Sequence, residues 1–208
     1  MLLEYLRSTY GVNQPIFISR VRYGSCTTNS IRQQIKKLVD AGRLKKYDTG
    51  IYFIPGETIF KSGAALSWNK VVEEKYLFDG GRRAGYSTGI GFMNELGLTS
   101  QVPSICEITT NKTAREYRRV TVVGVPIVLR KPRVKIGDKN WTALRLLDSM
   151  KEIASFSEIF GAERTRRLLD HMNAAGVRFQ DLAKLLPLYP DQIYRNLYET
   201  GLLNGIPA

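Results

Sequence analysis

The sequence predicts an α+β protein in three parts, which cover residues 1–56, 57–136 and 137–208. The first two parts alternate segments of helical apolar spacing with short apolar runs typical of strands, whereas the last part has helical patterns throughout. Glycine and proline residues separate most of these segments, and helices and strands commonly end at such residues. A chain of 208 residues is long enough for more than one hydrophobic core.

The first part is predicted to contain two helices joined by a short strand. Residues 1–9 have the apolar spacing of a helix, and residues 15–24 are predicted to form a strand, or a strand that runs into a short helix. A second helix is expected to begin at a cap formed by Thr27 or Thr28 and to end at Gly42.

The second predicted helix has two chemically different faces. Ile31, Ile35, Leu38 and Val39 recur at the spacing of a buried stripe. The opposite face carries cations and amides and has no acidic residue before Asp40. These are the side chains that reach phosphates and base edges in protein–DNA complexes.

Residues 43–56 follow this helix and are predicted to form a hairpin with its turn at residues 48–50. Two helices followed by a hairpin are the order of a winged helix-turn-helix, in which the second helix enters the major groove and the hairpin lies beside it. The alternative is a solvated amphipathic helix in an unrelated α+β unit. The predicted DNA-binding residues are Thr27, Thr28, Asn29, Arg32, Gln33, Lys36 and Lys37 on the helix, and Arg43, Lys45, Lys46 and Tyr47 on the hairpin.

The positive charge is unevenly distributed along the chain. Residues 1–56 hold 9 Lys and Arg against 3 Asp and Glu, residues 57–136 hold 13 against 7, and residues 137–208 hold 9 against 9, which together give the net charge of +12. This distribution favours a polyanionic partner for the first two parts, because cations that meet phosphates release counterions. Solubility is the alternative explanation for the excess.

The central part is predicted to be a compact α+β lobe. A helix is expected over residues 67–77 and should end at residues 80–81, and a glycine-rich helix is expected over residues 88–96. Three strands are expected between residues 104 and 136, the last two joined as a hairpin at residues 124–125.

The C-terminal region is predicted to be a helical lobe. A helix is expected from about residue 140 to residue 151, and two or three more should follow, with Gly176 and Gly201 as stops. Because this region has no net charge, it is the expected place for protein contacts.

No catalytic, metal or cofactor site is predicted. Two cysteines and one histidine cannot form a disulfide framework or a structural zinc site. The segment "GYSTGIGF" lacks the endings of phosphate-binding loops, and Glu107 with Lys112 superficially resembles a nuclease site but lacks a clear second carboxylate. The longest apolar run, residues 120–129, is too short to span a membrane, and the first residues do not resemble a signal peptide, so a cytoplasmic location is expected.

Three segments together resemble AbiEi-family antitoxins, the DNA-binding halves of type IV toxin–antitoxin systems. They are "IRQQIKKLVDAGRLKKYDTGIYFIP", "GYSTGIGFMNELGLTSQVPSICEITTNK" and "RRVTVVGVPIVLRKP". The resemblance implies a winged-helix repressor of its own operon, within an abortive-infection (phage defence) system whose neighbouring gene encodes a nucleotidyltransferase-like toxin. It also implies that the N-terminal domain binds operator repeats and that the C-terminal part counters the toxin without a stable complex.

An operator with two half-sites requires two winged domains, either in a homodimer or in two monomers side by side. Two other functions remain open at this stage. The basic surface could hold the substrate of a metal-dependent nucleic-acid enzyme, either a nuclease or a nucleotidyltransferase. Alternatively, the protein could be a protein-binding adaptor whose C-terminal helices contact the partner. Of these readings, we expect the DNA-binding repressor and antitoxin, without enzymatic activity.

Overall fold

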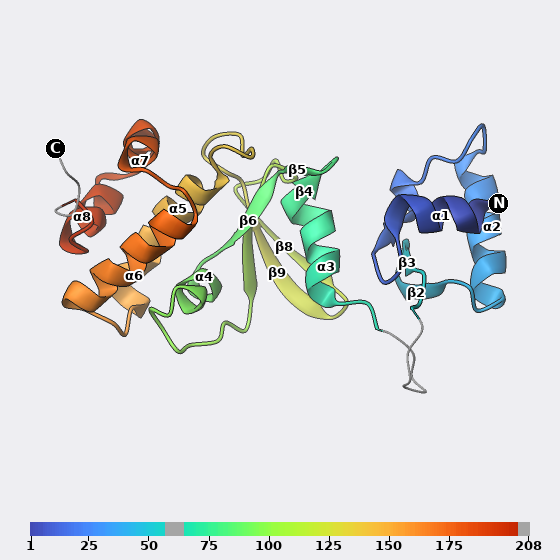
Figure 1. Ribbon diagram of the computed structural model, residues 1–208, viewed down its shortest axis with the longest axis horizontal. Coiled ribbons are helices and arrows are strands. Elements are labelled where there is room, and N and C mark those ends of the chain that lie inside the picture. Colours follow the sequence, from blue (N-terminus) through green and yellow to red (C-terminus); the bar gives the residue numbers. More distant parts are fainter. Residues whose placement is uncertain (57–64, 204–208) are drawn as a thin grey trace. The chain divides into compact units, whose positions relative to one another are not determined.

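The computed structural model describes residues 1–56 and 65–203, and the chain divides into two compact units, Met1–Lys75 and Tyr76–Ala208 (Figure 1). Helices and sheets both occur, so the predicted α+β class is confirmed. The predicted boundary after residue 56 adjoins residues 57–64, which lie outside the described residues. The predicted boundary after residue 136 falls inside the second unit.

The first unit contains a small antiparallel sheet and two main helices. Its strands are in the order β1-β3-β2, with β1 and β2 both paired to β3. The predicted helix, strand with short helix, helix and hairpin are all present. The elements are α1 (Leu2–Tyr10), β1 (Ile16–Phe17), the 3₁₀ turn η1 (Ile18–Arg20), α2 (Thr28–Asp40), β2 (Lys45–Asp48) and β3 (Ile51–Phe53).

One apolar cluster holds these elements together. Leu6 of α1, Ile16 of β1 and Ile35 of α2 are buried in it. Leu44, directly before β2, and Ile54, directly after β3, are buried in the same cluster. Burial of apolar surface stabilises such a core by about 25 cal/mol per Å². Because α2 and the residues that flank the hairpin strands share this core, the core holds the helix and the hairpin together.

The predicted helix over residues 67–77 changes character halfway. It is α-helical in α3 (Trp68–Val72) and continues as a π-helical turn, η2 (Glu73–Leu77). Gly80 and Gly81 do not end this helix but form the turn between β4 (Phe78–Asp79) and β5 (Arg82–Arg83). Both glycines have positive φ, 55° and 79°, as a two-residue hairpin turn of this kind requires.

The second unit is built on a four-stranded sheet in the order β6-β7-β9-β8. Its strands are β6 (Gly85–Thr88), β7 (Cys106–Thr110), β8 (Tyr117–Val122) and β9 (Val125–Arg130). The pairing of β7 with β9 is parallel, and the other two pairings are antiparallel. The three predicted strands and their hairpin are confirmed. Strand β6 is not predicted, and the glycine-rich helix predicted over residues 88–96 is limited to α4 (Ile90–Glu95).

Helices of the C-terminal region pack onto this sheet and onto one another. They are α5 (Trp141–Phe156), α6 (Gly161–Ala174), α7 (Phe179–Leu185), the 3₁₀ turn η3 (Leu186–Leu188) and α8 (Asp191–Glu199). Helix α5 contacts β6 and α4 as well as α7 and α8 (Figure 1). Its buried residues Leu144, Leu147 and Met150 join cores shared with the central part. The central and C-terminal parts therefore form one unit rather than two.

Among residues 1–56 and 65–203, no helix has both the length and the apolar character needed to cross a bilayer.

Candidate nucleic-acid interface

Helix α2 is fixed at both ends by local interactions that its sequence provides. The Thr27 hydroxyl accepts a hydrogen bond from the Ser30 N–H at 3.3 Å, which satisfies one of the free donors of the first turn. Gly42, just after the helix, has a φ of 68°, a conformation that favours glycine. Ile31 and Ile35 are buried, whereas Leu38 and Val39 are half-buried at the edge of the core.

The opposite face of α2 is open to solvent. All seven residues predicted on this helix are exposed: Thr27, Thr28, Asn29, Arg32, Gln33, Lys36 and Lys37. Arg32 Nη1 donates to the Asn29 carboxamide oxygen at 3.4 Å. The polar face therefore presents amide and cationic groups outward from a helix whose other face is buried.

The hairpin presents a second set of predicted residues. Arg43 and Lys46 are exposed, and Lys45 and Tyr47 are half-buried. The Tyr47 ring packs edge-on against Phe53, with 6.4 Å between ring centroids. Burial raises the pKa of the Tyr47 hydroxyl above its usual value, so this group remains a neutral hydrogen-bond donor at physiological pH.

Backbone hydrogen bonds tie the hairpin to the segment that precedes α2. Strand β1 pairs with β3, and the Ile18 N–H of η1 donates to the Gly50 carbonyl oxygen in the hairpin turn at 3.0 Å. Helix α2 and the hairpin also share the core cluster around Ile35 and Leu44. The structure therefore brings the helix residues and the hairpin residues together on one folded unit.

The cations of this surface are mostly without acidic partners. Residues 28–40 carry three cations and one carboxylate, and residues 43–48 carry three cations and one carboxylate, so each segment has a net charge of +2. In the described part of the chain, five of these six cations form no ion pair: Arg32, Lys36, Lys37, Arg43 and Lys46. Their charges are available to an external anion.

Arg22 is a candidate that the sequence reasoning missed. It is exposed in the segment that joins η1 to α2, and its Nη1 donates to the carbonyl oxygens of Ser19 and Val21 at 2.9 and 3.0 Å. These bonds hold the guanidinium against the turn. The sequence held a signal for Arg22, because this cation precedes the helix on which the DNA contacts are predicted.

Glu107 and Lys112, which superficially resemble a nuclease site in the sequence, each contact another residue in the structure. Glu107 accepts a hydrogen bond from Arg130 Nε at 2.8 Å, and Lys112 forms an ion pair with Asp79 at 3.4 Å. Within residues 1–56 and 65–203, no three His, Cys, Asp or Glu residues are grouped so that they could hold a metal ion. The nearby Gly89 has a φ of 72°, and a Cβ there would lie 3.5 Å from the Glu107 side chain, which fits a packing role.

His171 is also placed among structural contacts. Its ring packs edge-on against Phe92, with 5.2 Å between centroids. Burial, together with the nearby positive charge of Arg145, lowers its pKa, so the neutral ring is favoured.

Comparison with known proteins gives this chain no family assignment, because no family model matches it and no curated protein matches it.

Proposed function

We propose that this protein is a sequence-specific DNA-binding repressor of its own operon and an AbiEi-like antitoxin. The observation that carries the DNA-binding part is the exposed row of amide and cationic side chains on α2, anchored to the same core as a basic hairpin. The first unit then acts as a winged helix-turn-helix domain, with α2 as its recognition helix.

The chemistry of the α2 face suits the major groove of duplex DNA. This groove is about 12 Å wide and admits a helix, and its base edges present distinct patterns of donors and acceptors. Arg32 can donate two hydrogen bonds to a guanine, and Gln33 or Asn29 can pair with an adenine. Lys36 and Lys37 reach the flanking phosphates.

The hairpin supplies contacts that do not depend on sequence. Arg43 and Lys46 are exposed cations without an acidic partner in the described part of the chain, and such cations pair with backbone phosphates. Tyr47 keeps a neutral hydroxyl that can donate to a phosphate oxygen. Two copies of the domain, in a homodimer or side by side, would read an operator with two half-sites.

The antitoxin part of the proposal rests on the resemblance, whose most specific pieces are "GIYFIP" in the hairpin and "LGLTSQVP…EITTN" in the second unit. The Glu158 carboxylate accepts hydrogen bonds from the Thr99 hydroxyl and the Ser100 N–H, both at 2.8 Å. These bonds lower the pKa of Glu158 and keep it ionised. We propose that this unit counters a nucleotidyltransferase-like toxin encoded next to the protein.

Binding of the full chain to DNA tests the repressor proposal. A fragment from the promoter of its own gene and a random fragment of equal length are titrated at two salt concentrations. We expect the promoter to bind at least about 10³-fold more tightly than random DNA, and both affinities to fall as salt rises. Equal affinity for the two fragments at both salt concentrations would rule out a sequence-specific repressor.

Co-expression tests the antitoxin proposal separately. The nucleotidyltransferase-like protein encoded beside this gene is produced with the full chain or with a chain that ends at Lys75. We expect the full chain to restore growth and the shortened chain to fail. Equal growth with both chains would show that the second unit does not counter the toxin, while leaving the DNA-binding result unchanged.

A further inference from the structure

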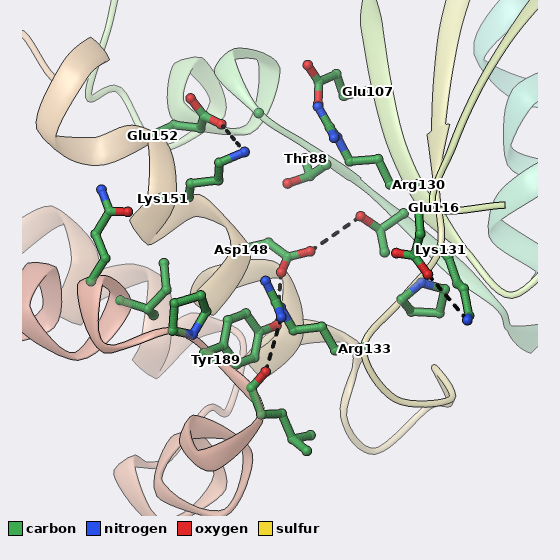
Figure 2. A pocket seen from close by; sticks show the side chains of 17 residues that line it. Thr88, Glu107, Glu116, Arg130, Lys131, Arg133, Asp148, Lys151, Glu152 and Tyr189 are labelled. Carbon is green, nitrogen blue, oxygen red and sulfur yellow. Dashed lines mark hydrogen bonds and ion pairs between the residues drawn. The ribbon is translucent and has the colours of Figure 1, made fainter.

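A polar cavity of about 510 Å³ lies in the second unit, between the sheet, α5 and the segment that leads into α8 (Figure 2). Small-molecule sites commonly have volumes of about 300–1,000 Å³. The proposed DNA-binding surface lies in the first unit and does not involve this cavity. Of the residues that line the cavity, only Glu107 and the segment around Gly89 are candidates for a site in the sequence, and a site is predicted at neither.

Asp148 of α5 is held at one side of the cavity by three hydroxyl groups from three other segments. Its carboxylate accepts hydrogen bonds from Tyr86 at 2.8 Å, Tyr189 at 2.9 Å and Thr109 at 3.3 Å. Because these hydroxyls donate to Asp148, the Thr109 and Tyr189 oxygens keep lone pairs that can accept hydrogen bonds. This part of the cavity is therefore rich in fixed acceptors.

Three cations surround the same space and keep unused donors. Arg133 Nη1 donates to the Leu188 carbonyl oxygen at 3.2 Å, and its guanidinium lies 4.7 Å from the Tyr189 ring centre, but it forms no ion pair with any described residue. Lys151 Nζ lies 4.0 Å from a carboxylate oxygen of Glu152, the next residue in the chain. Arg130 contacts Glu107 through Nε, which leaves its terminal nitrogens for another acceptor.

Figure 2 shows Arg133 reaching toward Asp148, and Lys151 extending from α5 on the other side of Asp148. Cations with free N–H groups bind phosphate oxygens through charge-assisted hydrogen bonds, which are about twice as strong as neutral ones. A ligand that also carries hydroxyl or amino groups would donate to the acceptors around Asp148. The lining thus fits an anionic group and hydrogen-bond donors in one molecule.

We propose that this cavity binds a phosphorylated small molecule of about mononucleotide size that carries hydroxyl or amino donors. The phosphate lies among Arg133, Lys151 and the terminal nitrogens of Arg130. The donors of the ligand meet Asp148 and the neighbouring hydroxyl oxygens.

The acidic residues of the lining argue against a nucleic-acid strand at this site. Glu107, Glu116 and Glu152 line the same cavity, so a chain of successive phosphates would meet like charges. A single phosphate can be placed among the cations while the rest of the molecule donates to the carboxylates. A small ligand therefore suits a cavity lined by both cations and carboxylates better than a polymer of phosphates does.

Calorimetric titration of the full chain tests the proposal. The ligands are the four ribonucleoside 5′-monophosphates, ribose 5-phosphate, the corresponding nucleosides and inorganic phosphate. We expect at least one organic phosphate to bind saturably, and its unphosphorylated counterpart and inorganic phosphate to bind at least about tenfold more weakly. No saturable binding of any organic phosphate up to roughly 10 mM, or equal binding of inorganic phosphate, would overturn the proposal.

Paired variants locate the binding. Arg133→Gln and Lys151→Gln should each lower the affinity for that ligand at least about tenfold. Arg195→Gln and Lys139→Gln are matched controls, because both residues are exposed cations of the same unit outside the cavity lining. Equal losses in the controls would show general attraction to a basic protein and would overturn the proposed site. All four variants replace exposed side chains, and a thermal unfolding midpoint close to that of the wild type would show that each one folds.

A single-stranded oligonucleotide is the last titrant. The proposal predicts that it binds at this site more weakly than the best mononucleotide. If it binds more tightly, and if Arg133→Gln and Lys151→Gln remove that binding, the cavity belongs to a nucleic-acid surface and the small-ligand proposal is wrong. Neither result depends on whether the first unit binds an operator.

Discussion

Arg32 donates from Nη1 to the Asn29 carboxamide oxygen at 3.4 Å, so the two side chains are linked across one turn on the exposed face of α2. The bond orients the carboxamide of Asn29, whose oxygen accepts, while its amino group makes no hydrogen bond to any residue that the structure describes. It occupies one guanidinium nitrogen of Arg32 and leaves the others for a base edge. Arginine and asparagine therefore form a pair on the proposed recognition helix.

Replacing Arg32 with alanine tests this pair. Arg32→Ala should reduce discrimination at one operator position by about 1–3 kcal/mol, because a base-edge contact is lost. Binding to the operator and to single-position variants of it measures the change, and Gln33→Ala should have the same kind of effect at another position. Arg195→Ala in the second unit is the matched control and should leave discrimination intact. Unaltered base preference in Arg32→Ala would contradict the proposed role of α2.

The hairpin should behave differently from the helix. Lys46→Ala removes an exposed cation and should weaken operator and random DNA by the same factor, because a phosphate contact carries no sequence information. The slope of log affinity against log salt concentration should fall by about 1. Titrations at three salt concentrations measure it, and a loss confined to the operator would show that Lys46 reads bases instead.

The start of α2 depends on one side-chain hydrogen bond. Thr27→Ala removes the acceptor of the Ser30 N–H and should lower the free energy of unfolding of the first unit by about 1 kcal/mol. Thr27→Ser keeps the hydroxyl and should restore most of the loss. Urea unfolding followed by circular dichroism measures both variants. An unchanged midpoint in Thr27→Ala would mean that this cap contributes little to the stability of α2.

The ionisation of Asp148 should make stability depend on pH. Burial raises the pKa of Asp148 in the folded protein, although the Tyr86 and Tyr189 hydroxyls and Arg133 oppose the shift. Between the unfolded and the folded pKa the native state binds more protons, so this carboxyl favours folding most at low pH and loses that contribution as pH rises through the folded pKa. The neutral variant Asp148→Asn lacks this dependence.

Urea unfolding of the wild type and of Asp148→Asn over a series of pH values from mildly acidic to neutral checks the sign. The stability of the wild type relative to the variant should fall as pH rises. The opposite trend would mean that the three hydroxyl groups and Arg133 outweigh the effect of burial on the carboxylate.

The elements of the first unit were largely predictable because their signals are local. The Thr27 cap, the stripe of Ile31 and Ile35, and the glycine after α2 all act within a few residues of one another. The exposed face of α2 follows from the same periodicity, since burying one side of a helix leaves the other side outward. The hairpin turn was indicated by Asp48, Thr49 and Gly50.

The pattern failed where pairing joins distant segments. The sequence pattern predicts no strand at β6, because this four-residue segment has no strand signal of its own and only the pairing with β7 makes it a strand. The pattern also predicts a helix stop at the two glycines after η2, whereas these glycines form a hairpin turn. The cavity was also missed, because its cations and carboxylates are spread along the chain from Thr88 to Ile193.

The sequence by itself determined the α+β class, the two faces of α2 and the basic hairpin, since each depends on interactions between near neighbours in the chain. Tertiary structure decided that the central and C-terminal parts share one core, that β7 and β9 run parallel, and that Asp148 meets three hydroxyl groups beside Arg133. The physical reason is that packing and strand pairing join residues tens of positions apart, and local periodicity carries no record of which distant partner each residue will meet.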